Sequence, residues 1–453
     1  MRREDVGLGV RENAAALASP EEAAWDWTLK AAILLALTLL IYGTAAGHFL
    51  QPLLREAELR HWPRFLRAAG LFWALLGIGL MLLRTLLWFR YRPHPAAPMG
   101  DAPRLTVIIP AYNEGAMVAH SIDSVAAACY PADRLEILVV DDGSRDDTWT
   151  HIEAASRRHE GRVTAIRFER NRGKRAALAE GFRRARGEVV LTIDSDSVIE
   201  PNTLLAMTGP FRNPRVGAVA GRVHVYNRDQ GLIPRMLHVR FTLTFDVLRA
   251  VQSTYGTVYC CPGALAAYRT AVVRTVLARW VDQTFLGSAC TFGEDRSLTN
   301  YILAERYDAV YQRTGVVHTL VPVTYARLCK MFLRWDRSYV REELRFARIL
   351  WSRPWPARAL SLVDAGVTNG AYLMGYSSLV LLLSAATVHP ILLLHVLAGI
   401  GLMSALNMLY FLRTERSWRF VYGIVYGYYS ALVLFWILPY AAITVRARSW
   451  LTR

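Results

Sequence analysis

The stretch LTVIIPAYNE (residues 105–114) decides the fold. It opens with a short apolar run rich in β-branched residues and ends at a proline, which is typical of a buried strand. EILVVDDGS (136–144), RVTAIRF (162–168) and GEVVLTIDSDS (187–197) repeat this pattern, with helical stretches such as 174–186 between them. Alternating strands and helices predict an α/β domain with a mostly parallel sheet and helices on both faces.

Polar motifs follow three of these strands where each strand ends: Tyr112–Glu114, Asp141–Asp142 and Asp194–Asp196. In such sheets ligands bind beyond the carboxyl ends of the strands. Acids in these places also form turns and cap helices, an interpretation that Gly143 and Ser144 favour after Asp142. The Asp-x-Asp pair suits Mg²⁺ or Mn²⁺, because hard cations take oxygen ligands and keep sites open for phosphate.

Two further motifs carry charge. Arg172–Gly173–Lys174–Arg175 begins a predicted helix, where cations suit a phosphate-bearing ligand or a solvated helix face, and Lys174 is the expected ligand contact. GEDRSLTNYIL (293–303) opens another helix, whose start favours acids on electrostatic grounds alone. The functional interpretation is that Asp295 is a general base, which takes a proton from an acceptor hydroxyl.

A basic stripe marks the segment 325–351. Its cations recur in steps of three and four, at 327, 330, 334, 337, 341, 345 and 348, so they share one side of a helix. We expect this helix to lie on the inner leaflet, with most of these side chains in contact with lipid. Arg334 and Trp335 are the expected exception, with a guanidinium for a pyrophosphate and an indole for a sugar ring.

The apolar residues, 53% of the chain, gather in runs long enough to cross a bilayer as helices. These runs are 31–50, 68–89, 365–412 with a turn at His389–Pro390, and 420–445. They predict about five spans, within a range of four to six. The expected organisation is a cytoplasmic segment at 1–30, two spans at 31–90, a cytoplasmic domain at 101–324, interfacial helices at 325–364, C-terminal spans at 365–445 and a basic tail at 446–453, in the plasma (inner) membrane.

The net charge is +16, from 53 basic and 37 acidic residues. No module typical of nucleic-acid binding accompanies it, so we expect no nucleic-acid partner. Anionic lipid headgroups or an anionic substrate such as a sugar nucleotide explain the basic balance. The five cysteines form no Cys-x-x-Cys pair, which argues against zinc.

The order Asp142, Asp194-x-Asp196, Asp295 and Arg334–Trp335, set between membrane spans, resembles the processive family-2 glycosyltransferases. These include the cellulose, chitin, poly-N-acetylglucosamine and hyaluronan synthases. QTFLG (283–287), GEDRSLTNY (293–301) and VYQ (310–312) most resemble the hyaluronan synthases, and LRWDRS (333–338) also resembles the chito-oligosaccharide synthases of nodulation. WLTR (450–453) is similar to a Trp-Gly-Thr-Arg gating motif of the hyaluronan synthases, with Leu451 at the glycine.

The resemblance implies a GT-A fold that takes a UDP-sugar, with Mg²⁺ or Mn²⁺ as cofactor and a growing glycan as acceptor. The donor that the resemblance implies is UDP-N-acetylglucosamine, with UDP-glucuronate as well if the product is hyaluronan. The implied roles are UDP binding by Tyr112, Glu114, Asp142 and Lys174, metal binding by Asp196 with Asp194 near the metal or the ribose, proton removal by Asp295, and contacts to pyrophosphate and acceptor by Arg334 and Trp335. Glu294 and Arg296 of the same motif are expected to bind substrate as well.

Two departures from the family pattern bear on the product. Met331 stands where the family has a glutamine, which removes an amide from the acceptor side, and PGALAAYR (262–269) replaces the acceptor-site pattern of the hyaluronan synthases. The expected activity is an inverting polymerase that forms a β-linked polysaccharide and translocates it, of hyaluronan, chitin, chito-oligosaccharide or poly-N-acetylglucosamine type. The alternatives are a transferase that places one sugar on a membrane lipid and a scaffold without activity.

Overall fold

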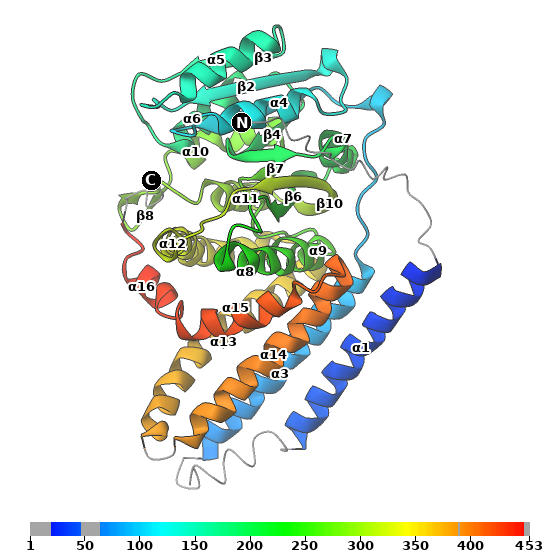
Figure 1. Cartoon of the computed structure of the whole chain (residues 1–453), viewed down its shortest axis with the longest axis vertical. Helices are drawn as coiled ribbons and strands as arrows, with labels where there is room; N and C mark the ends of the chain where they lie inside the picture. The colour runs from blue at the N-terminus through cyan, green and yellow to red at the C-terminus, as the bar shows by residue number, and fades with distance from the viewer. Residues whose placement is uncertain (1–19, 47–63, 388–389, 448–453) are drawn as a thin grey trace.

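The computed structural model describes residues 20–46, 64–387 and 390–447. A sheet domain stands above a group of long helices, with a layer of helices between the two (Figure 1). The predictions for residues 1–19, His389 and WLTR (450–453) concern positions outside the described residues.

One eight-stranded sheet forms the centre of the domain, in the order β3-β2-β1-β4-β7-β6-β10-β5. The four predicted strands are confirmed as neighbouring parallel strands: β1 (Leu105–Ala111), β2 (Leu135–Asp141), β3 (Val163–Arg167) and β4 (Val189–Ile193). In β1, Val107 and Ile109 pack toward one side with Ile122, whereas Ile108 packs toward the other side with Phe182. Both faces are covered, which explains why this strand is one continuous apolar run.

The other half of the sheet mixes directions. Its strands are β5 (Ser197–Ile199), β6 (Val216–Val225), β7 (Leu265–Arg269) and β10 (Asp308–Thr319). β7 runs antiparallel to β4 and β6, β10 runs parallel to β6, and β5 closes the edge antiparallel to β10. A short hairpin of β8 (Thr284–Phe285) and β9 (Ser288–Ala289) lies apart from this sheet.

Helices cover both faces of the sheet. They are α4 (Met117–Ala126), α5 (Thr148–Arg158), α6 (Lys174–Arg184), α7 (Thr203–Thr208), α10 (Thr270–Val281) and α11 (Glu294–Ala304), with 3-10 turns η2 (Met99–Asp101), η3 (Ala132–Arg134), η4 (Gly209–Arg212) and η6 (Leu350–Ser352). The core behind α6 contains the buried side chains of Phe182, Tyr268 and Trp280, whose rings meet edge to face. Trp280 also joins the first turns of α6 and α11, because its carbonyl accepts a hydrogen bond from Arg175 and its indole donates to the carbonyl of Glu294.

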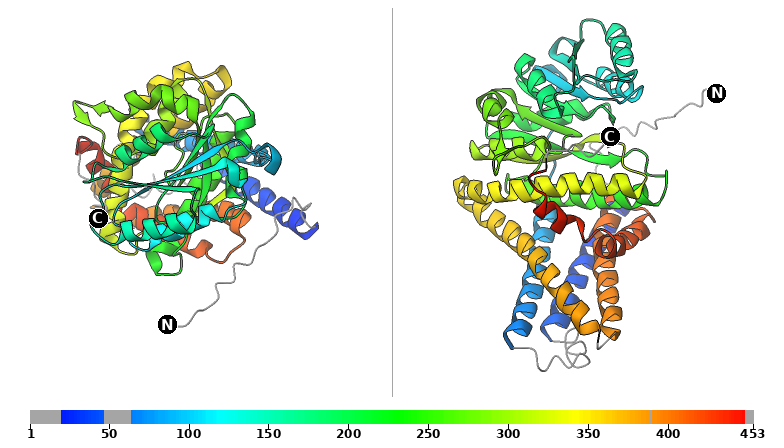
Figure 2. Two further views of the ribbon diagram at one scale, coloured as in Figure 1. Left: turned by 90° about the horizontal axis from the view of Figure 1, so that it is seen from above. Right: turned by 90° about the vertical axis from the view of Figure 1, so that its left-hand side faces the viewer.

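A layer of helices separates the sheet domain from the long apolar helices (Figures 1 and 2). It consists of α8 (Leu232–Phe241), a π-helical segment η5 (Thr242–Leu248), α9 (Arg249–Ser253) and α12 (Tyr325–Ile349). α8 and α12 meet through Phe241, Phe332 and Trp335, whose ring centroids lie 5.7 to 6.0 Å apart.

The long helices are α1 (Pro20–Ala45), α3 (Arg64–Arg90), α13 (Trp355–Ala386) and α14 (Ile391–Glu415), followed by α15 (Phe420–Leu432) and α16 (Ile437–Ile443). In the described part of the chain, Ala24–Thr44, Phe72–Arg90 and Ile391–Glu415 are long and apolar enough to cross a membrane. Phe420–Leu432 with Ile437–Ile443 makes a fourth only if this pair, bent by 46°, counts as one span.

The described residues thus contain three or four helices apolar enough to span a membrane, where we expected about five within a range of four to six. α13, which we expected to cross the membrane, is not among these apolar helices. Its first half carries polar side chains that meet other helices: Asp364 and Thr368 bind Arg84 of α3, at 2.7 Å each, and Asn369 accepts a hydrogen bond from Tyr339 of α12. Arg84, within an apolar helix, is thus held by polar partners from α13.

The basic stripe of α12 is also divided in a way that the sequence did not predict. Arg327, Lys330 and Arg348 are exposed, but Arg337 and Arg341 in the middle of the stripe are buried. Arg341 donates to the carbonyl of Phe292, and Arg337 donates to the hydroxyl of Thr444 near the end of α16. The expected lipid contact is thus wrong for these two arginines, because the chain itself covers that part of the helix.

Candidate active site

Asp142 lies in the loop after β2, and its side chain is buried. Its two carboxylate oxygens accept hydrogen bonds from the backbone amides of Arg172 (2.7 Å) and Gly173 (2.8 Å). Burial raises the pKa of Asp142 above the ordinary value, although these two amides oppose the shift. Asp142 therefore fixes the loop that leads into α6, where Gly173 adopts a positive φ of 89°.

Lys174, the first residue of α6, joins two acidic motifs. Its ammonium donates to the carboxylate of Asp194 and lies 3.4 Å from a carboxylate oxygen of Glu294. Burial alone would lower the pKa of Lys174, but the Asp194 and Glu294 carboxylates raise it above the ordinary value. Burial alone would likewise raise the pKa of Glu294, and the charge of Lys174 brings it below the ordinary value.

Asp194 and Asp196 flank the break between β4 and β5, and both line a cavity. Thr319 donates to Asp196 over 3.3 Å from the neighbouring strand β10. These oxygens fit a hard divalent cation, which one or two carboxylates hold together with phosphate oxygens and water. Within the described residues no group of three or more His, Cys, Asp or Glu side chains could hold a metal.

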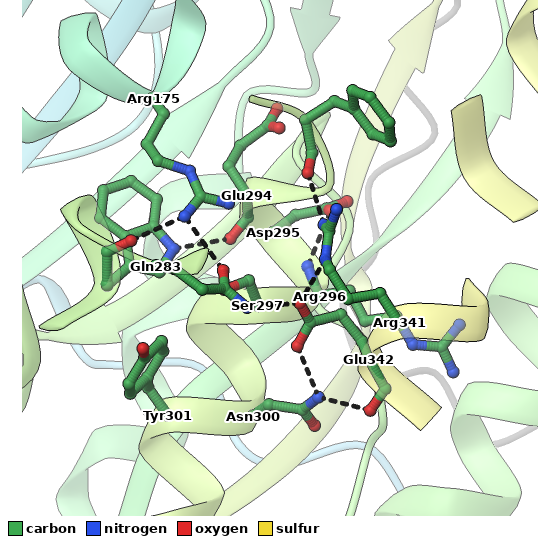
Figure 3. Close-up of polar contacts among 12 residues, drawn as sticks. Arg175, Gln283, Glu294, Asp295, Arg296, Ser297, Asn300, Tyr301, Arg341 and Glu342 are labelled. Carbon is green, nitrogen blue, oxygen red and sulfur yellow. Dashed lines mark hydrogen bonds and ion pairs between the residues drawn. The ribbon is translucent and has the colours of Figure 1, made fainter. Parts of the chain in front are cut away.

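Asp295 follows Glu294 in the first turn of α11 (Figure 3). One oxygen of its carboxylate accepts a hydrogen bond from the backbone amide of Arg296 (2.7 Å). The other accepts a hydrogen bond from the backbone amide of Gly263 (3.2 Å) and lies 3.7 Å from the thiol of Cys260. Burial, and next the Glu294 carboxylate, raise the pKa of Asp295 above the ordinary value. Two adjacent carboxyls thus differ in proton affinity, which is the arrangement that separates a base from a charge partner.

The start of α11 depends on a glycine. Gly293 has a φ of 73°, and a Cβ at this position would lie 1.9 Å from the hydroxyl oxygen of Ser338 in α12. Only glycine fits both the left-handed backbone and this close approach. It brings the acids of α11 against α12.

Arg296 points toward α12, where its guanidinium binds Glu343 at 2.5 Å and lies over the ring of Tyr339. Arg334 and Trp335 line the same cavity as Asp295, and Trp335 packs among Phe241, Phe245 and Phe332. The expected substrate-binding residues of α11 and α12 are thus brought to one place.

Tyr112 and Glu114 lie in the loop after β1. This loop lies beside that of Asp142, because the backbone amide of Asp142 donates a hydrogen bond to the carbonyl of Ala111 at the end of β1. The amide of Glu114 donates to the hydroxyl of Thr148. Both are half-buried, and neither lines the cavity that contains Asp295. Tyr112 and Glu114 thus lie at the ligand-binding edge of the sheet but outside the cavity that Asp295 lines.

One cavity of about 1120 Å³ connects these residues with the long helices. At the sheet it is lined by Lys174, Asp194, Asp196 and Asp295. It continues past Trp335 and between the helices, where its lining includes Arg84 of α3, Thr368 and Leu382 of α13, Val396 and Ile400 of α14, and Ser430 of α15. A ligand bound at the acids therefore has a continuous hollow leading toward the apolar part of the molecule.

Sequence reasoning missed a buried polar network behind Asp295 (Figure 3). Glu342 of α12 accepts hydrogen bonds from Gln283 (2.7 Å), Arg341 (3.0 Å) and Asn300 (3.1 Å). Arg175 of α6 donates to Gln283, and so does Ser297 of α11. The network holds α6, α11 and α12 together, and the polar residues of QTFLG and GEDRSLTN were its signal in the sequence.

Comparison with known proteins agrees with this arrangement. Residues 106–277 match the profile of the family described as "Glycosyl transferase family 2". The chain is 31% identical to an N-acetylglucosaminyltransferase of Azorhizobium caulinodans over 355 residues, which cover 78% of this chain and 87% of that protein. It is 34% identical to a hyaluronan synthase of Streptococcus pyogenes over 290 residues, 63% of this chain and 68% of that protein.

Among solved structures, a mannosyltransferase from Pyrobaculum calidifontis in complex with GDP-mannose and Mn²⁺ superposes with a TM-score of 0.57. The match covers 79% of this chain and 97% of that one, at 22% identity. The likeness concerns the fold alone, and it confirms the expected GT-A fold with its mostly parallel sheet.

Proposed function

The chain belongs to glycosyl transferase family 2, and on this basis we propose that it is a membrane-embedded, inverting transferase that joins UDP-sugars into a β-linked polysaccharide and translocates it. The observation that carries this proposal is the single cavity from Asp194 and Asp295 to Ile400, between the apolar helices. A transferase that places one sugar on a lipid needs a site but no such passage. A long polar product cannot cross hydrocarbon unaided, so it needs one.

The proposed chemistry is direct displacement at the anomeric carbon of an α-linked UDP-sugar. Asp295 takes the proton of the acceptor hydroxyl as its oxygen attacks, and inversion gives a β-linkage. The amides of Gly263 and Arg296 hold both oxygens of this carboxylate in position. Its raised pKa makes it a stronger base than an ordinary aspartate.

At the donor end, Asp196 and Asp194 would hold Mg²⁺ or Mn²⁺. When bound, such an ion neutralises charge that grows on the leaving diphosphate. Lys174 and Arg334 add cationic side chains at the same end of the cavity. The loops that carry Tyr112, Glu114 and Asp142 would contact the uridine, since they lie at the same edge of the sheet.

The proposed location is the plasma (inner) membrane, with the sheet domain in the cytoplasm. Arg90 ends α3 on the side of this domain and Arg92 follows it, in agreement with the positive-inside rule. We propose UDP-N-acetylglucosamine as donor, because one relative bears the name N-acetylglucosaminyltransferase. UDP-glucuronate would be the second donor if the product is of hyaluronan type, as the other relative's name suggests.

The test supplies labelled UDP-N-acetylglucosamine to the purified full chain in lipid vesicles, first alone and then with UDP-glucuronate. The proposal predicts metal-dependent UDP release and long products. Asp295→Asn is the control, which should abolish transfer and leave UDP binding largely intact. A single sugar on lipid would instead identify a lipid glycosyltransferase. Absence of UDP release both with UDP-N-acetylglucosamine alone and with the two donors together would refute the proposed activity.

A further inference from the structure

One acid in the cavity has no hydrogen-bond or ion-pair partner among the described residues. Seven acids line it: Asp194, Asp196, Glu294, Asp295, Asp336, Glu343 and Asp364. Six of them bind a cation, a hydroxyl or a backbone amide. Asp336, two residues after Arg334 on α12, forms no hydrogen bond or ion pair with any residue in the parts of the chain that the structure describes.

The groups around Asp336 do not neutralise it directly. The charged and titratable groups that face it are Arg240 of α8, Arg296 of α11, Tyr339 of α12, and Tyr372 and Tyr376 of α13. Arg296 is bound to Glu343 at 2.5 Å, and Arg240 lies over the rings of Phe332 (4.8 Å) and Tyr426 (5.4 Å). Burial raises the pKa of Asp336 to about 6, with the two arginines opposing the shift.

This part of the wall suits a sugar. Trp335, Tyr339, Tyr372 and Tyr426 line the same cavity and offer aromatic surface, on which the apolar face of a sugar ring can rest. An ionised carboxylate only accepts hydrogen bonds, and a buried one without donors is costly. Hydroxyl and amide groups of a ligand would supply those donors.

The charge of the cavity points the same way. Six cations line it, against the seven acids: Arg84, Lys174, Arg240, Arg249, Arg296 and Arg334. Arg84, Lys174 and Arg296 are each held by an acid. Among the described residues the lining thus carries no cationic excess, although the whole chain has a net charge of +16. A passage for a polyanion would require the opposite balance.

We propose that Asp336 is a specificity-determining residue of the acceptor site, whose carboxylate binds the hydroxyl and amide groups of an uncharged sugar and repels a sugar that carries its own carboxylate. This inference rests on the proposed function and names its substrate class. The growing chain consists of uncharged sugars of the N-acetylhexosamine class, not of alternating hexosamine and uronate.

The test measures binding rather than transfer. The full chain in detergent, with UDP and Mg²⁺, is titrated with chitotetraose and with a hyaluronan tetrasaccharide. The wild type should bind chitotetraose at least about 10-fold more tightly, which is the worth of one hydrogen bond to a charged group. In Asp336→Asn this preference should disappear, through weaker binding of chitotetraose and tighter binding of the hyaluronan tetrasaccharide. Asp133→Asn, an exposed acid of η3, is the matched control and should keep the wild-type preference.

Equal binding of the two oligosaccharides by the wild type, or an unchanged preference in Asp336→Asn, would overturn the inference. If Asp336→Asn does not fold, the wild type is titrated at different pH values. The preference should be full well above pH 6 and decline as the pH falls through about 6, because the carboxyl is then protonated. A preference independent of pH would contradict the role of Asp336. Failure of the proposed function would appear separately, as absence of UDP release.

Discussion

The ammonium of Lys174 lies 3.4 Å from the carboxylate of Glu294 and also binds Asp194, so the first residue of α6 joins the acids after β4 to those that begin α11. β4 follows α6 directly in the chain, whereas α11 begins only at Glu294. The donor end and the acceptor end of the proposed reaction therefore share one cation, and its removal should affect both.

Lys174→Met should lower transfer by about 10²-fold, because the change removes a positive charge from the place where negative charge develops. It also leaves Asp194 and Glu294 to repel one another. The measurement is the rate of UDP release from UDP-N-acetylglucosamine. Lys330→Met, at an exposed position of α12, is the control and should keep wild-type activity. A rate near wild type for Lys174→Met would remove this lysine from the proposed site.

The pH dependence of transfer should reveal the proton on Asp295. Its pKa is raised, so the ionised base is present above that pKa and is lost as the pH falls through it. The acid limb of kcat/KM should therefore lie above the ordinary aspartate pKa of about 3.9. Glu294→Gln removes the neighbouring like charge and should move this limb to lower pH. A limb that stays in place or moves upward would contradict the proposed coupling between the two acids.

Removal of divalent metal by a chelator should abolish UDP release, and Mn²⁺ or Mg²⁺ should restore it. Asp196→Asn should require at least about 10-fold more metal for half-maximal activity, since it loses a ligand charge. Asp133→Asn, in η3 and remote from Asp196 in the chain, should require the same metal concentration as the wild type. Full activity after chelation would show that neither acid of the 194–196 pair needs a metal.

Glu342→Gln should destabilise the protein by about 3 kcal/mol or more, because it leaves the buried guanidinium of Arg341 without its charge partner. Thermal unfolding in detergent measures the change. Glu305→Gln breaks an exposed pair with Arg279 and should cost only about 0.5 kcal/mol. Equal effects of the two substitutions would mean that the network around Glu342 contributes little to stability.

Gly375→Phe should separate synthesis from translocation. Gly375 lines the cavity within α13, and a Cβ there would meet no atom within 4 Å, so a larger side chain can start from this position toward the passage. Long products should be lost while UDP release with a short acceptor continues. A Cβ at Gly399 of α14 would likewise meet no atom within 4 Å, and Gly399 is not part of the cavity lining. Gly399→Phe should therefore leave product length unchanged. Unchanged length in both variants would argue against this passage.

Much of the site could be predicted because strand ends are visible in the sequence. A buried parallel strand is a continuous apolar run, so the acids that follow β2 and β4 mark the ligand-binding edge of the sheet. The second half of the sheet escaped prediction, since β6 and β10 mix apolar residues with polar ones such as Arg222 and Gln312. Partners such as Glu343 for Arg296 escaped as well, because ion pairs between helices depend on packing.

By itself, then, the sequence determined the order of strands and acids, the approximate positions of the apolar helices, and the glycine and acids at the start of α11. The tertiary structure decided which neighbours cover each face. It buried Arg337 and Arg341 within a stripe whose two ends are exposed, held Arg84 against Asp364, and left Asp336 without a hydrogen-bond or ion-pair partner among the described residues. The physical reason is that periodicity records which residues share a face of a helix, whereas the environment of that face depends on elements far away in the chain.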